Sequence, residues 1–160
     1  MSYKTDLPRF TGGLNINLEY KSFYSIILLQ WAAGAEVDHK TESGEWGNFL
    51  AEDAEGRWTP DNTDATKPRT WERNDQYWSS GINNTYWRRN NDYMRLKNVE
   101  IGYNMPNQII NKLGIDGLRI YLSGINLFTL TKLKSVDPEV TSIETYPPNK
   151  VYNAGLTLTF

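Results

Sequence analysis

The last ten residues of the chain, 151–160, alternate strictly between two kinds of side chain. Because successive side chains of a β-strand point to opposite faces, this period of two predicts a strand with one apolar and one mostly polar face. The strand runs to a terminal aromatic residue, Phe160. Two architectures fit such a strand: the closing strand of a membrane β-barrel, whose outward face meets lipid, and the last strand of a soluble β-sandwich.

The composition excludes several classes of protein. With a net charge of -2, the chain has no basic patch for nucleic acid, and without cysteine it has neither disulfides nor thiolate metal sites. His39 is the only histidine, so a Ser-His-Asp triad and a multi-histidine metal site find no support. Glu52, Asp53 and Glu55 lack the turn pattern of a calcium loop and are expected to form a solvated helix face. We therefore predict no enzyme, no cofactor and no metal.

The hydropathy pattern limits how the chain can meet a membrane. Mean hydropathy is -0.62, and no stretch approaches the roughly 18 consecutive apolar residues of a membrane helix. Barrel strands need only about 9–11 residues and carry their apolar face in alternation, so a barrel stays open. The N-terminus has no apolar core of a signal peptide, which predicts either a cytoplasmic protein or a piece of a longer one.

Five segments have strand character, and the links between them alternate short, long, short, long. The clearest is the first, where the apolar residues Leu14, Ile16 and Leu18 alternate with polar ones. The apolar phase slips near Lys97-Asn98, which predicts a β-bulge there. Residues 107–113 have the spacing of a short helical turn with Asn107 as a cap and Gly114 as a stop. The predicted strands are residues 10–21, 23–35, 92–104, 117–131 and 150–160.

The first long link, residues 37–91, shows no strand pattern and carries most of the tryptophans. Trp46 to Glu55 is compatible with a short helix. Aromatic rings in such a loop suit three roles: stacking on a sugar ligand, packing against a partner protein, or packing the loop's own small core. The tryptophans in question are Trp46, Trp58, Trp71, Trp78 and Trp87.

Several motifs, in order and at matching spacing, resemble the C-terminal end of SusC/RagA-type TonB-linked outer-membrane transporters. They cover nearly the whole chain and are densest from Asp92 to Phe160: the segment 93–103, Met105-Pro106, the strand 118–129, Asp137-Pro138-Glu139, and Tyr146-Pro147 before the final strand. Pro8-Arg9-Phe10-Thr11-Gly12-Gly13 fits the same family upstream.

The resemblance implies an all-β fold, namely a partial transmembrane β-barrel of about five antiparallel meander strands in an open curved sheet. A whole family barrel has about 22 strands around an N-terminal plug. Neither the plug nor the earlier strands correspond to anything in residues 1–160. The short links are expected on the periplasmic side and the long links on the extracellular side.

The resemblance also implies a function and partners. The family imports glycans or peptides across the outer membrane of Gram-negative bacteria. A SusD-like surface lipoprotein acts as a lid, and energy comes from the TonB complex through the missing N-terminal part. The spacing of Asn153, Gly155, Leu158 and Phe160 resembles the signal read by the barrel assembly machinery. Tyr20, Phe23 and Tyr103 are expected to form an aromatic girdle at the membrane interface.

The alternative function is that of a soluble, tryptophan-rich β-sandwich that binds carbohydrate. The two architectures differ in what covers the apolar faces of the first and last strands. A barrel exposes Leu156, Leu158 and Phe160 to lipid and turns Thr157 and Thr159 to the lumen. A sandwich packs the apolar faces of its strands against each other.

Overall fold

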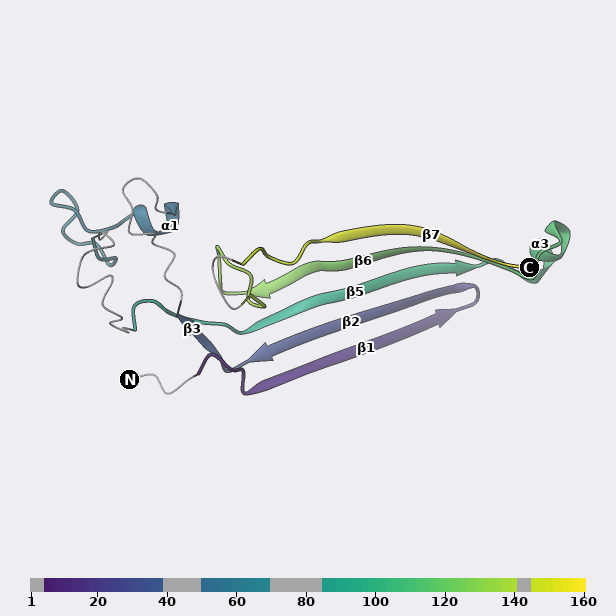
Figure 1. Ribbon diagram of the computed structural model, residues 1–160, viewed down its shortest axis with the longest axis horizontal. Coiled ribbons are helices and arrows are strands. Elements are labelled where there is room, and N and C mark those ends of the chain that lie inside the picture. Colours follow the sequence, from purple (N-terminus) through teal and green to yellow (C-terminus); the bar gives the residue numbers. More distant parts are fainter. Residues whose placement is uncertain (1–4, 39–49, 70–84, 141–144) are drawn as a thin grey trace.

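The computed structural model describes residues 5–38, 50–69, 85–140 and 145–160. Its main feature is one five-stranded antiparallel sheet (Figure 1) in the order β1-β2-β5-β6-β7. The strands are β1 (Phe10–Tyr20), β2 (Phe23–Ala33), β5 (Tyr93–Asn104), β6 (Gly117–Thr131) and β7 (Val151–Thr159). Each strand of this sheet pairs with the next one along the chain, as in a meander. The prediction of a partial barrel built as an open antiparallel meander is therefore confirmed.

The two ends of the sheet differ in their connections. At the turn end, β1 and β2 are joined through Lys21 and Ser22, and β5 and β6 through the helix α3 (Asn107–Leu113). At the loop end, residues 34–92 and 132–150 connect the strands. The first of these excursions contains β3 (Glu36–Asp38), α1 (Ala51–Ala54) and β4 (Arg88–Asn90). In Figure 1, α1 and its neighbouring residues lie well beyond the end of the sheet.

β3 and β4 correct the expectation that residues 37–91 contain no strand. They pair antiparallel with each other and form a separate two-stranded sheet next to the main one. Each strand has only three residues, which is too short for an alternating pattern to be recognised. Their pairing joins segments about 50 residues apart, so it depends on how the chain folds back and not on local sequence.

The predicted β-bulge is present at Lys97. Leu96 pairs with Phe128 of β6, whereas Asn98 pairs with Ile125, so the register shifts between them. Against β2 the register shifts between Leu28 and Leu29, where β5 carries one residue more than its partner. One extra residue on β5 keeps the apolar side chains before and after the bulge on one face of the sheet.

The connections at the turn end follow the local sequence closely. Lys21 has a positive φ of 55°, which lets the chain reverse between β1 and β2. The helix α3 ends at Gly114 in the left-handed conformation (φ 68°), as predicted. The expected cap at Asn107 is wrong by one position, because Pro106 is the N-cap and supplies no capping side chain.

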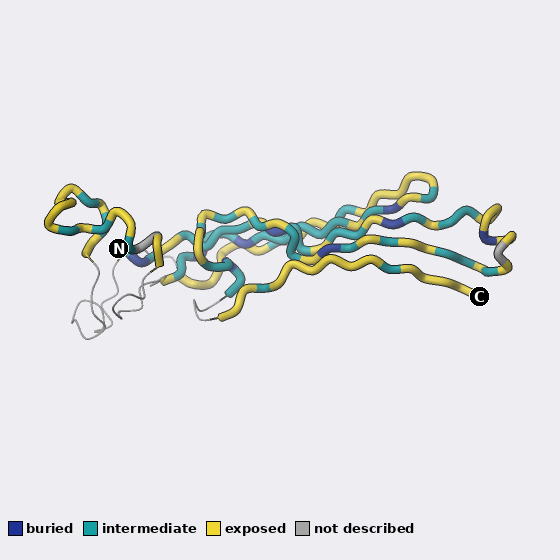
Figure 2. The backbone as a smooth tube through the Cα atoms, turned by 90° about the horizontal axis from the view of Figure 1, so that it is seen from above, coloured by how far each residue is buried: buried dark blue, intermediate teal, exposed yellow. Residues whose placement is uncertain are grey.

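The sheet forms a single layer, and the alternative of a soluble β-sandwich is wrong for this reason. β1 and β7 lie at opposite edges of one sheet, so their apolar side chains do not pack against each other. Exposed and intermediate residues predominate along the strands in Figure 2. Within the described residues, the buried hydrophobic side chains are few and scattered: Tyr24, Ala32, Ala35, Trp87 and Ile110. No helix in this part of the chain is both long and apolar enough to cross a membrane.

Candidate functional site

One face of the sheet, which we call the apolar face, carries almost only apolar side chains. The register defines it, because residues paired across antiparallel strands project to the same side. One row across the sheet, for example, runs from Ile27 on β2 through Val99 and Gly124 to Tyr152 on β7. Most exposed large hydrophobic side chains of the structure lie on this face. They include Leu14, Leu18, Tyr20, Phe23, Met94, Ile101, Ile120, Leu122, Phe128, Leu130, Tyr152, Leu156 and Leu158.

The opposite face, which we call the polar face, is dominated by hydrogen-bonding groups. One of its rows runs from Asn17 through Ile26, Glu100 and Ser123 to Asn153. Thr157 and Thr159 project to this side and Leu156 and Leu158 to the other, as the sequence predicts. A continuous apolar face of this extent is atypical of a soluble monomer, whose apolar patches rarely exceed a few hundred Å². One face of the sheet therefore suits an apolar environment and the other suits water.

An ion cluster occupies the loop end of the polar face. Arg95 on β5 is only 1% exposed, and its Nη2 donates to both carboxylate oxygens of Asp137 at 2.7 and 2.6 Å. Its Nη1 donates to Glu139 Oε2 at 3.1 Å. Lys97 Nζ lies 2.9 Å from the same oxygen, and the Tyr93 hydroxyl donates to Glu139 Oε1 at 3.3 Å.

The cluster fixes a short segment that we call the strap, residues 137–140. Glu139 N donates to Asp137 Oδ1 at 2.9 Å, and Val140 N donates to Asp137 O at 3.2 Å. Asn91 Nδ2 donates to the carbonyl of Pro138, which is buried. Part of the connection between β6 and β7 is therefore folded inward onto β5. Two basic and two acidic side chains neutralise each other there, which is the condition under which charges are tolerated away from water.

Sequence reasoning marked Asp137-Pro138-Glu139 as a family motif but gave it no role, and it missed Arg95. One sequence signal could have indicated the cluster. Two basic residues, Arg95 and Lys97, lie two positions apart on a predicted strand, so that they share its polar side. Their partners lie about 42 residues away. Only the inward fold of the loop brings these groups together.

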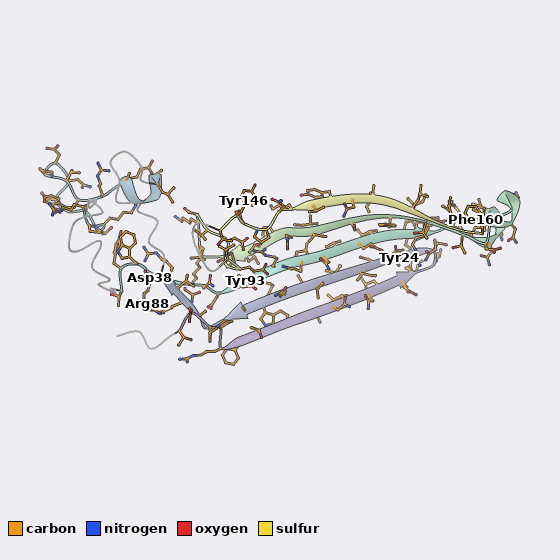
Figure 3. The ribbon with its side chains drawn as sticks, in the orientation of Figure 1. Tyr24, Asp38, Arg88, Tyr93, Tyr146 and Phe160 are labelled. Carbon is orange, nitrogen blue, oxygen red and sulfur yellow. The ribbon has the colours of Figure 1, made fainter. Side chains whose placement is uncertain are left out.

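A second group of polar side chains lies at the turn end of the polar face. The Tyr24 hydroxyl donates to Glu100 Oε1 at 2.7 Å, and the guanidinium of Arg119 lies 5.1 Å from the centre of the Tyr24 ring. Arg119 Nε also donates to Asn104 Oδ1 at 3.0 Å. Figure 3 places Tyr24 at this end of the sheet and Tyr93 near the other. Charged groups at both ends are thus held on one side of the sheet.

The loop tryptophans are not gathered at one described site. Trp46, Trp71 and Trp78 lie outside the described residues, as does His39. Trp58 is 40% exposed in a small turn closed by the bridge between Arg57 and Lys67. Trp87 is 7% exposed and meets the Tyr86 ring edge-on at 4.9 Å, which favours the loop-packing role for this residue. Ligand or lid contact by the tryptophans stays a prediction.

In the terminal strand, Gly155 has a packing environment that the sequence did not indicate. The ring of Tyr121, its partner on β6, covers it so closely that a Cβ on Gly155 would lie 2.4 Å from Tyr121 Cζ. Trp31 covers Gly12 in the same manner on the apolar face. Asn153 shares the polar face with Gly155, whereas Leu158 lies on the apolar face and Phe160 is 85% exposed. Recognition of this strand by assembly machinery stays a prediction.

The three expected girdle residues do lie together. Tyr20, Phe23 and Tyr103 form one row of the apolar face at the turn end. The rings of Phe23 and Tyr103 are 4.7 Å apart at an angle of 59°, and the ammonium group of Lys21 lies 5.3 Å from the Tyr20 ring. Aromatic rings with a cation beside them suit a membrane–water interface, but the girdle itself stays a prediction.

Comparison with known proteins agrees with this two-faced sheet. No family model matches the chain. The chain is 34% identical over 134 residues to TonB-dependent receptor P3 of Formosa agariphila, a match that covers 82% of this chain and 13% of the receptor. It is 30% identical to TonB-dependent receptor P26 of the same organism, covering 96% of this chain and 17% of that one. The chain thus spans less than a fifth of the length of these curated relatives.

Solved structures give the same result for the fold. The chain superimposes on the RagAB peptide importer in its closed-closed state with a TM-score of 0.79 and 28% identity, covering 99% of this chain and 18% of the other. A second RagAB peptide transporter structure gives a TM-score of 0.79 and 29% identity. In sequence and fold, the chain therefore matches a segment of TonB-dependent receptors of the RagA type.

Proposed function

We propose that the chain is a wall segment of an outer-membrane importer of glycans or peptides in a Gram-negative bacterium. The observation that carries the proposal is the separation of the two faces of the sheet. The apolar face suits contact with lipid, and the polar face suits an aqueous lumen. The similarity to TonB-dependent receptors supports the same function.

The rest of the importer is proposed to come from outside these 160 residues. β1 and β7 each have an edge without a partner strand in the described structure, and unpaired backbone groups are not tolerated in lipid. The proposed complete protein supplies the other strands, the plug and the contact with the TonB complex. It is inserted by the barrel assembly machinery, and a SusD-like lipoprotein closes its extracellular mouth. This last partner is supported by the likeness to the two-component RagAB importers.

The orientation in the membrane is part of the proposal and can be tested directly. The turn end is assigned to the periplasm and the loop end to the cell exterior. A protease site is inserted in the complete protein either at Asp61-Asn62, in the exposed turn after α1, or at Lys21-Ser22. Protease added to intact cells is expected to cut the first insertion and leave the second intact, while both are cut after lysis. Cleavage of the second site alone in intact cells would reverse the orientation.

Location and transport need a separate readout. The complete protein is expected in the outer-membrane fraction, with an electrophoretic mobility that changes on heating. Deletion of its gene is expected to abolish uptake of one class of labelled oligosaccharide or peptide. A complete protein recovered in the soluble fraction would contradict the proposal.

A further inference from the structure

The strap, the polar face and residues 6–8 line a half-open cavity that the ion cluster does not fill. Its volume is about 440 Å³, which falls at the lower end of the range for ligand pockets. Gln30 and Ala32 of β2, Tyr93 and Lys97 of β5, and Val140 of the strap line it. The cavity therefore lies at the loop end of the proposed lumen, where an incoming nutrient first meets the wall.

The only cation of the described lining, Lys97, and one of its two carboxylates, Glu139, already have partners. Lys97 Nζ lies 3.2 and 2.9 Å from the two carboxylate oxygens of Glu139. The remaining carboxylate in the lining is Asp6, which is exposed at the edge. An anionic ligand would meet this negative group and find no unpaired cation in the described lining. The electrostatics therefore disfavour an anionic ligand.

The neutral polar groups of the cavity remain available. The register places Thr11 and Gln30 on the polar face, because Thr11 pairs with Ala32 and Gln30 pairs with Arg95. In the part of the chain that the structure describes, the Gln30 amide makes no hydrogen bond. An amide and a hydroxyl both donate and accept, as the hydroxyl groups of a sugar do. Ala32 and Val140 add apolar surface for the C–H face of a sugar ring.

From these observations we propose that the cavity is a subsite for a short neutral segment of a glycan, held against the wall by the strap. The proposal rests on the proposed import function and deepens it. The strap forms one wall of the subsite through Val140, and the ion cluster fixes its position. Gln30 contacts the sugar hydroxyls directly. A free peptide fits less well, because its terminal carboxylate would find no unpaired cation among the described lining residues.

The test uses the complete transporter, purified in detergent. The variants are Val140→Trp, which fills the cavity, and Gln30→Ala, which removes its free amide. Val151→Trp and Asn17→Ala are matched controls, since both residues project from the polar face and do not line the cavity. The probes are maltotetraose, cellotetraose, laminaritetraose and xylotetraose, with tetragalacturonate and a pentapeptide pool for comparison. Binding is measured by calorimetry.

At least one neutral tetrasaccharide is expected to bind the unmodified transporter. Val140→Trp should weaken that binding more than tenfold and Gln30→Ala about fivefold, while the controls stay within twofold. Unchanged binding in both cavity variants would overturn the subsite, as would failure of every neutral tetrasaccharide to bind. A loss confined to peptide or tetragalacturonate would overturn its assignment to neutral glycans. The import function is tested separately, by the outer-membrane location of the unmodified protein and by its energised uptake. The subsite can therefore fail while the import function stands.

Discussion

The two faces of this sheet are built from the same strands, yet one exposes large apolar side chains and the other buries a charged one. The apolar face leaves large side chains such as Leu122 and Leu156 64% exposed, with no second layer to cover them. The polar face holds the most buried charged side chain of the described structure, Arg95, in a compensated cluster. A soluble protein would bury the former and expose the latter. The two faces therefore suit different surroundings: the apolar face suits contact with lipid, whereas the polar face packs against the strap at its loop end.

The largest effect is expected from placing a charge on the wrong face. Leu122 and Ser123 are neighbours in the middle of β6 and project to opposite faces. An arginine at the membrane midplane on the lipid side costs about 2–4 kcal/mol. Leu122→Arg in the complete transporter should therefore strongly reduce the amount of folded protein in the outer membrane, measured by its heat-modifiable mobility. Ser123→Arg is the control and should assemble normally; equal losses in both would remove the distinction between the faces.

The next largest effect concerns the ion cluster. Arg95→Ala leaves the partly buried carboxylates of Asp137 and Glu139 without their main partner. Breaking a buried ion pair costs about 3–5 kcal/mol, and the partial exposure of these carboxylates lowers the expected cost to about 2 kcal/mol. The strap should detach, and limited proteolysis should cut residues 132–149 faster.

Arg119→Ala serves as the control for that experiment. This arginine is exposed on the same face, and its loss should change stability by less than about 0.5 kcal/mol. Proteolysis of the Arg95 variant at the unmodified rate would show that the strap is held by something other than the cluster.

A smaller effect tests the packing of the terminal strand. In Gly155→Ala the new methyl group collides with the Tyr121 ring, and overpacking of this kind costs about 1–3 kcal/mol. The double variant with Tyr121→Ser should recover assembly, measured as the yield of folded barrel. If Gly155 acts only as part of an assembly signal, removing the ring will not restore the yield.

The smallest effect is expected at the aromatic row of the turn end. Phe23 and Tyr103 interact through tilted rings, a pair worth about 0.5–1.5 kcal/mol beyond its buried area. A double-mutant cycle with Phe23→Leu and Tyr103→Leu should give a coupling energy in that range in unfolding titrations. A coupling near zero would indicate that the rings interact with lipid rather than with each other.

The strands, and the faces of β1 and β7, could be predicted from the sequence because both depend on local alternation. β2 is apolar on both sides in its middle, so its pattern assigned no face. Leu14, Ile16 and Leu18 indicate a face by themselves, and the phase slip at Lys97 indicates the bulge. The short strands β3 and β4 escaped prediction, since three residues carry no period. The assignment of Gly155 to a recognition pattern missed its contact with Tyr121, because that contact depends on the pairing of β6 with β7.

By itself, the sequence determined that this chain forms a meander of two-faced strands with alternating short and long connections. The physical reason is that the period of two and the turn residues act within a few positions of each other. Only the tertiary structure decided that β3 pairs with β4, that Arg95 is buried, and that the strap lines a cavity. These features arise from pairings across tens of residues, where the energy of a contact depends on how the intervening loop returns to the sheet.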